Sequence, residues 1–209
     1  KSLIHNARER NCVVITATQM MQSMIESPIP TRAEVFDVAN AVLDGTDAVM
    51  LSAESSIGKY PAKVVQALSR ICRESEHYRR VSGHRLDSCF GRVDEAIAMA
   101  TMYTANHLAV KAVAALTETG LTVKWMSRMN TGIPIYAMTR FAQTRRKVTL
   151  YRGVYPVSFD VASKDMHEVN KEVIDELLRR GTVQEGDLVI ITKGDRSGVE
   201  GQTNIMKIM

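Results

Sequence analysis

Short apolar runs alternate with longer stretches of helical spacing along this sequence, and this alternation constrains the fold more than any other feature. Such alternation is typical of a largely parallel α/β architecture. Seven strands are predicted, at residues 13–17, 48–52, 113–117, 134–139, 155–159, 188–192 and 204–208.

Helix signals fill the intervals between these runs. Thr31 and Glu34 have the spacing of a capping box, so a helix is expected to begin there, and Gly45 lies where that helix would end. Pro61 suits the first turn of the next helix. A further helix is predicted at about 94–108, and an apolar stripe predicts another at about 164–180.

The alternation of apolar runs and helical spacing stops at residues 79–92, which are polar, contain two glycines and show no regular hydrophobic period. Stretches of this kind commonly join domains. We therefore expect one region at 1–80, a linker at 81–92, and a separate α/β domain at 93–209.

The first region holds only two of the predicted strands. Two parallel strands with their helices leave open strand edges and uncovered apolar faces, which an independent domain does not tolerate well. We therefore expect residues 1–80 to be the last two βα units of a (β/α)₈ barrel. The sequence also starts at Lys1, within a stretch that looks helical, so we expect the longer protein to continue upstream.

Polar residues follow the two strands of this first region. Thr18 comes after the first strand, and Ser52 and Glu54 come after the second. Chemistry in (β/α)₈ barrels takes place at the carboxyl ends of the strands, so these side chains are candidates to line the barrel mouth. The alternative is that Thr18 and Ser52 only satisfy backbone groups at the strand ends.

A second candidate site lies at residues 117–122, between a predicted strand and a predicted helix. Free backbone N–H groups, the helix dipole and hydroxyls can converge on a phosphate there. Ordinary helix capping is the alternative. The residues of interest in this loop are Thr117, Thr119, Gly120 and Thr122.

The opposite wall of this site is expected at residues 193–204. Lys193 and Arg196 supply positive charge, and Gly198 permits close backbone approach. A glycine-rich turn before an edge strand is the alternative. Nearby, we expect Trp125 to pack in the core and Arg140 with residues 145–147 to form a solvated basic face.

Composition limits the partners and the compartment. The net charge is +4, and no basic block is long enough to indicate nucleic-acid binding. No apolar run approaches the roughly 18 to 20 residues of a membrane span. The three cysteines include no C-x-x-C pair, which argues against a disulfide framework or zinc ribbon and favours a reducing cytoplasm.

Several motifs resemble the pyruvate kinase family. The dense matches are VITATQMMQSM at 14–24, PTRAEV at 30–35, DVANAVLDGTD at 37–47 and MLSAE at 50–54. Looser matches are EAIAMA at 95–100 and GDRSGVEGQTN at 194–204. The overall look is that of a bacterial enzyme.

This resemblance implies phosphoryl transfer from phosphoenolpyruvate to ADP, giving pyruvate and ATP, with Mg²⁺ and K⁺, in a cytoplasmic homotetramer. Thr18 matches the family threonine that contacts substrate and has been assigned to the proton transfer to enolpyruvate. Ser52 and Glu54 match positions beside that site. Thr31 and Arg32 match positions at the contact between barrel domains of neighbouring subunits, although a capping box alone explains Thr31.

The family's catalytic lysine, metal ligands and phosphate-binding arginine lie on earlier barrel strands, which these residues do not include. We therefore expect no metal ligand in this chain and no activity from it alone. The family also binds an effector's phosphate at a loop corresponding to 117–122, which implies a sugar-phosphate or nucleotide-monophosphate effector. Leu121 departs from a frequently basic position and leaves the effector open.

Two other functions fit the sequence. One is a free-standing regulatory module that binds a phosphorylated ligand and performs no chemistry, with residues 1–78 stabilised by a partner chain. The other is a structural α/β protein with no small-molecule site.

Overall fold

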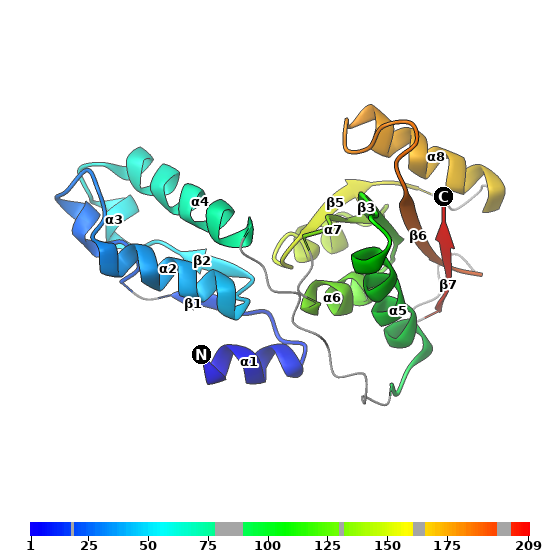
Figure 1. Ribbon diagram of the computed structural model, residues 1–209, viewed down its shortest axis with the longest axis horizontal. Coiled ribbons are helices and arrows are strands. Elements are labelled where there is room, and N and C mark those ends of the chain that lie inside the picture. The colour runs from blue at the N-terminus through cyan, green and yellow to red at the C-terminus, as the bar shows by residue number, and fades with distance from the viewer. Residues whose placement is uncertain (18, 78–89, 130–131, 161–165, 196–201) are drawn as a thin grey trace. The chain divides into compact units, whose positions relative to one another are not determined.

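The computed structural model describes residues 1–17, 19–77, 90–129, 132–160, 166–195 and 202–209. It divides into two compact units, Lys1–Arg80 and Val81–Met209 (Figure 1). All seven predicted strands are present, and their ends lie within two residues of the prediction. Most of the predicted linker at 81–92 lies outside the described residues.

The first unit contains a sheet of two parallel strands, β1 (Ile15–Ala17) and β2 (Ala48–Met50). In its register Ile15 pairs with Ala48 and Ala17 pairs with Met50. The helices of this unit are α1 (Ser2–Glu9), the 3₁₀ helix η1 (Gln22–Ile25), α2 (Arg32–Asp44), α3 (Ala53–Ser56) and α4 (Pro61–His77).

Helix α2 begins at the predicted capping box. The backbone N–H of Glu34 donates to the Thr31 hydroxyl, and the Glu34 carboxylate accepts from the backbone N–H of Thr31 at 2.8 Å. Gly45 ends the helix with a left-handed φ of 95°. A residue without Cβ adopts this conformation at little cost, so both predicted ends of the helix are confirmed.

The core of the first unit lies on one face of its two strands. Met20, Met21 and Val64 are fully buried among the helices, and Val49 packs against them. The opposite face is not covered in the same way, because Ile15 and Met50 are each 49% exposed. The face that carries Val49 is therefore packed, and the apolar face that carries Ile15 and Met50 remains half exposed.

The second unit contains a five-stranded sheet in the order β5-β4-β3-β6-β7. Neighbouring strands are parallel except β7, which runs antiparallel to β6 at the edge. The strands are β3 (Ala112–Leu116), β4 (Ile135–Thr139), β5 (Val154–Ser158), β6 (Val189–Gly194) and β7 (Thr203–Ile208).

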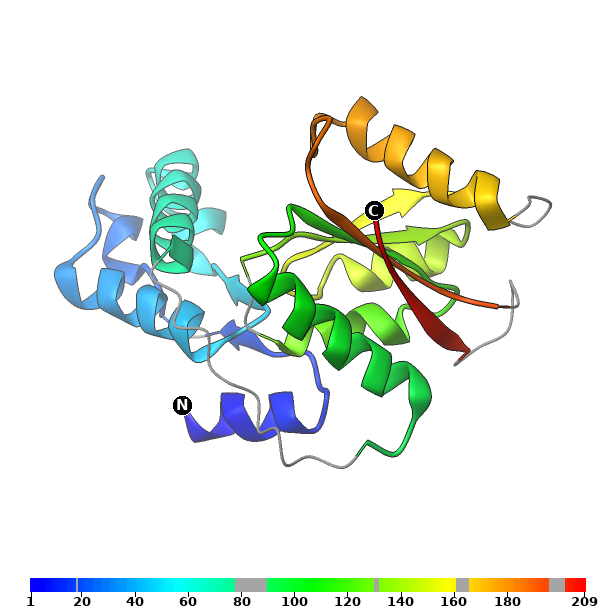
Figure 2. The same ribbon diagram turned by 45° about the vertical axis from the view of Figure 1, so that its right-hand side comes forward.

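Helices cover both faces of this larger sheet (Figure 2). Val113 and Ala115 face a core shared with α5 (Val93–His107), α6 (Leu121–Arg128) and α7 (Ala142–Val148). Ala112 and Ala114 face a second core under α8 (Met166–Arg179). Burial on both faces explains why β3 reads as a continuous apolar run without polar alternation.

Trp125 lies in the first of these two cores and is only 7% exposed. The Arg92 guanidinium lies 5.5 Å from the centre of its ring, within the range of a cation–π contact. Arg92 also forms an ion pair at 2.9 Å with Asp94, whose side chain is buried at the start of α5. The packing role predicted for Trp125 is confirmed.

Candidate functional site

The carboxyl ends of β1 and β2 form the first candidate site. Thr18, the residue predicted to act in chemistry, lies outside the described residues. The segment that follows it is well anchored, because Met20 and Met21 are buried in the core of the first unit. Ser52 follows β2 and is exposed, and its backbone N–H donates to the Glu54 carboxylate at 3.0 Å.

Glu54 does not present a free carboxylate to this edge of the sheet. Its side chain is 2% exposed, and its two oxygens accept from different backbone groups. Oε1 accepts from the N–H of Met21 at 3.3 Å, and Oε2 accepts from the N–H of Ser52. One buried side chain therefore joins the segment after β1 to the segment after β2.

A second carboxylate in the first unit, Glu34, is also occupied by hydrogen bonds. Burial opposes its ionisation, but bonds from the hydroxyl and backbone of Ser23 and from Thr31 together outweigh burial and lower its pKa. Thr31 and Arg32, the predicted subunit-contact residues, are both exposed. The capping box occupies Thr31, and Arg32 remains on the surface beside it.

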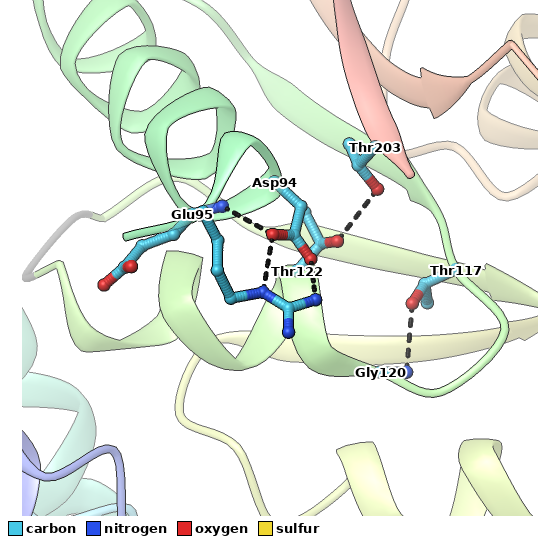
Figure 3. Close-up of polar contacts among 7 residues, drawn as sticks. Asp94, Glu95, Thr117, Gly120, Thr122 and Thr203 are labelled. Atoms are coloured by element: carbon cyan, nitrogen blue, oxygen red, sulfur yellow. Dashed lines mark hydrogen bonds and ion pairs between the residues drawn. The ribbon is translucent and has the colours of Figure 1, made fainter. Parts of the chain in front are cut away.

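The loop at 117–122 forms the second candidate site (Figure 3). Gly120 precedes α6 with a left-handed φ of 78°, and its N–H donates to the Thr117 hydroxyl at 3.0 Å. A methyl group at Gly120 would lie 2.6 Å from Cγ1 of Val148, so the loop requires glycine for both conformation and space. The Thr117 hydroxyl keeps its own proton to donate.

Thr122 connects this loop to the segment that was predicted to face it. Its hydroxyl lies 2.9 Å from the hydroxyl of Thr203, the first residue of β7, and both residues are buried (Figure 3). The bond spans 81 residues of sequence. The structure thus brings the two expected walls together at this point. Thr119 is half-buried in the same loop.

Lys193 points elsewhere. Its ammonium donates at 2.9 Å to Oδ1 of Asn170 on α8, and both residues are buried. Helix α8 covers the opposite face of the sheet from α6. This contact directs Lys193 away from the 117–122 loop. Arg196 and Gly198, the other residues predicted for that wall, lie outside the described residues.

Two cations predicted to lie on a solvated face, Arg140 and Lys147, are exposed and also reach the loop. The Lys147 ammonium donates to the carbonyl of Thr119 at 3.5 Å, and Arg140 lies 3.7 Å from the carboxylate of Glu118. Thr144 adds a 2.6 Å bond from its hydroxyl to the Glu118 carbonyl. The order of the strands could have predicted these contacts. The 117–122 loop follows β3 and Arg140 follows β4, and segments after neighbouring parallel strands meet at one edge of a sheet.

Metal-ligating side chains do not gather in the described part of the chain, where no group of three or more His, Cys, Asp or Glu is arranged around a common point. Among the same residues, no helix combines the length and apolarity needed to cross a membrane.

Comparison with known proteins identifies both units. Residues 1–65 match the family model described as pyruvate kinase, barrel domain, and residues 95–209 match pyruvate kinase, alpha/beta domain. The chain belongs to the pyruvate kinase family. Its first unit is thus the end of a barrel domain and its second is the family's α/β domain, which confirms the predicted fold class.

Similarity to individual pyruvate kinases extends over the whole chain. It is 51% identical over 212 aligned residues to pyruvate kinase II of Salmonella typhimurium and 50% identical to the pyruvate kinase of Buchnera aphidicola subsp. Baizongia pistaciae. Identity to the pyruvate kinase of Haemophilus influenzae is 45%. Each alignment covers 100% of this chain but 44% of the relative.

Proposed function

We propose that this chain is the carboxyl-terminal part of an enzyme that transfers a phosphoryl group from phosphoenolpyruvate to ADP, giving pyruvate and ATP in glycolysis. The observation that carries the proposal is identity of about 50% to pyruvate kinases over the entire chain, barrel segment included. A free-standing regulatory module would have no use for barrel-mouth residues.

Thr18 is the proposed catalytic and substrate-binding residue. A hydroxyl both donates and accepts, so it can pass a proton to the carbon of enolpyruvate and recover one from water. Its place directly after β1, at the carboxyl end of a barrel strand, supports this role. Ser52 follows the neighbouring strand β2 and is exposed.

Mg²⁺ and K⁺ would neutralise the charge that develops during phosphoryl transfer. The described residues do not fit a site for either ion, because no cluster of ligating side chains lies among them. Other parts of the enzyme would bind these ions and would contain the catalytic lysine. We therefore expect these 209 residues alone to form no pyruvate.

An effector's phosphate is the proposed ligand of the 117–122 loop. Thr117, Thr119, Gly120 and Thr122 supply hydroxyls and backbone N–H groups at the start of α6. Lys147 at the Thr119 carbonyl supports an anion here by placing positive charge beside the loop. Arg196 and Gly198 complete the residues proposed for effector binding. Lys193, also predicted for this site, binds Asn170 on the other face of the sheet.

The proposed assembly is a cytoplasmic homotetramer in which Thr31 and Arg32 contact the barrel domain of a neighbouring subunit. Their exposure supports this role. The exposed thiol of Cys12 is in keeping with a reducing compartment.

The catalytic proposal is tested with the full-length enzyme. Pyruvate formation from phosphoenolpyruvate and ADP is measured with Mg²⁺ and K⁺ for wild type, Thr18→Ala and the control Thr149→Ala. Thr149 is exposed on the second unit, and its hydroxyl donates to the Arg146 carbonyl. We expect Thr18→Ala to lower kcat by about 10²- to 10⁴-fold and the control to leave it unchanged. Full activity in Thr18→Ala would contradict the assignment.

The effector proposal is tested by thermal shift of the 209-residue chain with inorganic phosphate, glucose 6-phosphate and AMP. A ligand that binds only the folded state raises the melting temperature. We expect at least one phosphorylated compound to do so, and Thr119→Val to weaken the shift. A flat response to all three would count against the site.

A further inference from the structure

We propose that Glu54 is a positioning residue that fixes the spacing between the segment after β1 and the segment after β2, and so sets the geometry of the proposed proton-transfer site. The inference rests on the function proposed above, because it concerns how Thr18 and Ser52 are held for that reaction. It assigns Glu54 no contact with substrate.

The contacts of Glu54 support a clamp between two backbones. The side chain is 2% exposed, and one oxygen accepts from Met21 at 3.3 Å while the other accepts from Ser52 at 3.0 Å. Met21 is only three residues beyond Thr18, and it is fully buried. A shift of the Glu54 carboxylate would therefore move both strand-end segments or leave a buried N–H unpaired.

The chemistry of this clamp requires a carboxylate. A carboxylate offers acceptors on both oxygens, whereas a glutamine amide offers one oxygen and one NH₂ donor. In Glu54→Gln the NH₂ group would face one of the two backbone N–H donors. An unsatisfied buried donor is costly, so that segment would move away. Aspartate keeps both acceptors but is one methylene shorter and cannot reach both partners.

The pH dependence separates this role from proton carrying. Each Glu54 oxygen accepts from a backbone amide N–H, which neither gains nor loses a proton at neutral pH, so a clamp needs no proton on Glu54. A clamp predicts slow reaction at every pH once the geometry is lost. A proton carrier instead predicts that a shorter carboxylate restores activity over a shifted pH range.

Asp47 provides a matched control at the other end of the same strands. Its carboxylate accepts from the backbone N–H of Val14 at 2.9 Å and so also joins the β1 and β2 segments. This contact lies before β1 rather than after it. Asp47→Asn keeps one acceptor oxygen for Val14 but replaces a charge-assisted bond by a weaker neutral one. It does so without touching the carboxyl ends, where barrel chemistry takes place.

The test uses the full-length enzyme and separates proton transfer from phosphoryl transfer. Exchange of the pyruvate methyl protons with deuterated water is followed by NMR, and pyruvate formation and melting temperature are measured for each variant. We expect Glu54→Gln and Glu54→Asp to slow exchange by about 10- to 100-fold, as expected for small misplacement of a reacting group. Asp47→Asn is expected to lower the melting temperature and leave exchange at the wild-type rate.

Each outcome either supports or overturns the role of Glu54 as a clamp. Wild-type exchange in a folded Glu54→Gln, an equal loss in Asp47→Asn, or recovery in Glu54→Asp at a shifted pH would overturn the clamp while the proposed function stands. If Glu54→Gln does not fold, Glu54→Asp alone carries the comparison. A wild-type enzyme with neither exchange nor pyruvate formation would overturn the proposed function, and the inference with it.

Discussion

The two units differ in how completely the apolar side chains of their sheets are buried. Ile190 in β6 of the second unit is completely buried, whereas Ile15 in β1 of the first unit is 49% exposed. The larger sheet has helices over both faces, and the smaller one has a core on one face only. An apolar strand face that stays exposed therefore marks a surface that another part of the protein covers. For the first unit, which matches a barrel domain, that part is the rest of the barrel.

The largest effect is expected from separating the units. Residues 92–209 expressed alone should fold cooperatively, because their sheet has a core on each face. Residues 1–80 alone should not, because two strands with one covered face bury too little apolar surface. Circular dichroism during heating checks both. Cooperative unfolding of residues 1–80 would contradict the claim that the first unit needs further chain to fold.

The same substitution on the two sheets should have unequal cost. Ile190→Ala removes buried methyl and methylene groups and should lower the free energy of unfolding of the second unit by about 2–5 kcal/mol. Ile15→Ala should change the free energy of unfolding of the 209-residue chain by about 0.5 kcal/mol or less, because Ile15 is half exposed in it. Urea denaturation gives both values. Equal losses would show that Ile15 is already packed.

Two glycines with left-handed φ sharpen the picture of the second unit. Gly120 (φ 78°) meets Val148, whereas Gly153 (φ 71°) has no atom within 4 Å of an added Cβ. Gly153→Ala should cost about 1–2 kcal/mol for the conformation alone. Gly120→Ala should cost more, because Val148 must also move. Denaturation midpoints that rank the two in the opposite order would contradict this.

The sequence predicted the fold well where the signal is local. The capping box of Thr31 and Glu34 involves residues three apart, and both its bonds are present. The seven strands followed from apolar runs, although the antiparallel direction of β7 did not. Strand direction depends on where the chain returns to the sheet, which no local pattern records.

The candidate sites were predicted less completely, because their contacts join distant residues. Glu54 was placed beside the barrel mouth, but its bond to Met21 spans 33 residues. Lys193 was expected at the effector loop and instead binds Asn170. Lys147 was expected in a solvated face, yet it also contacts Thr119. A side chain's partner is set by packing, and only its type and position can be read from sequence.

The smallest effect concerns one carboxylate in each unit. Hydrogen bonds from Arg179 and Arg180 lower the pKa of Glu176 from 4.5 to about 2, and the pKa of Glu34 is also lowered despite its burial. A lowered pKa gives stability that is present above the unfolded value of 4.5 and is lost as pH falls through the folded value.

Each glutamine variant should flatten this acid dependence in its own unit. Glu176→Gln should act on the second unit between pH 4.5 and about 2, and Glu34→Gln should act on the first unit below pH 4.5. Arg179 and Arg180 are exposed, so solvent screens their charges. The change in the free energy of unfolding caused by Glu176→Gln should therefore be about 1 kcal/mol or less. Unfolding of the full-length enzyme measured against pH checks both, and an unchanged acid slope in either variant would contradict the assignment.

The central claim is that the first unit belongs to a barrel completed by chain outside these residues. The most direct test is the intact mass of the protein that an antibody to this 23.2 kDa chain captures from its source cells. The account predicts about 53 kDa, of which 23.2 kDa is 44%, the share that this chain covers in its relatives. A captured protein of 23.2 kDa would contradict it, because no further barrel strands would exist to close the sheet.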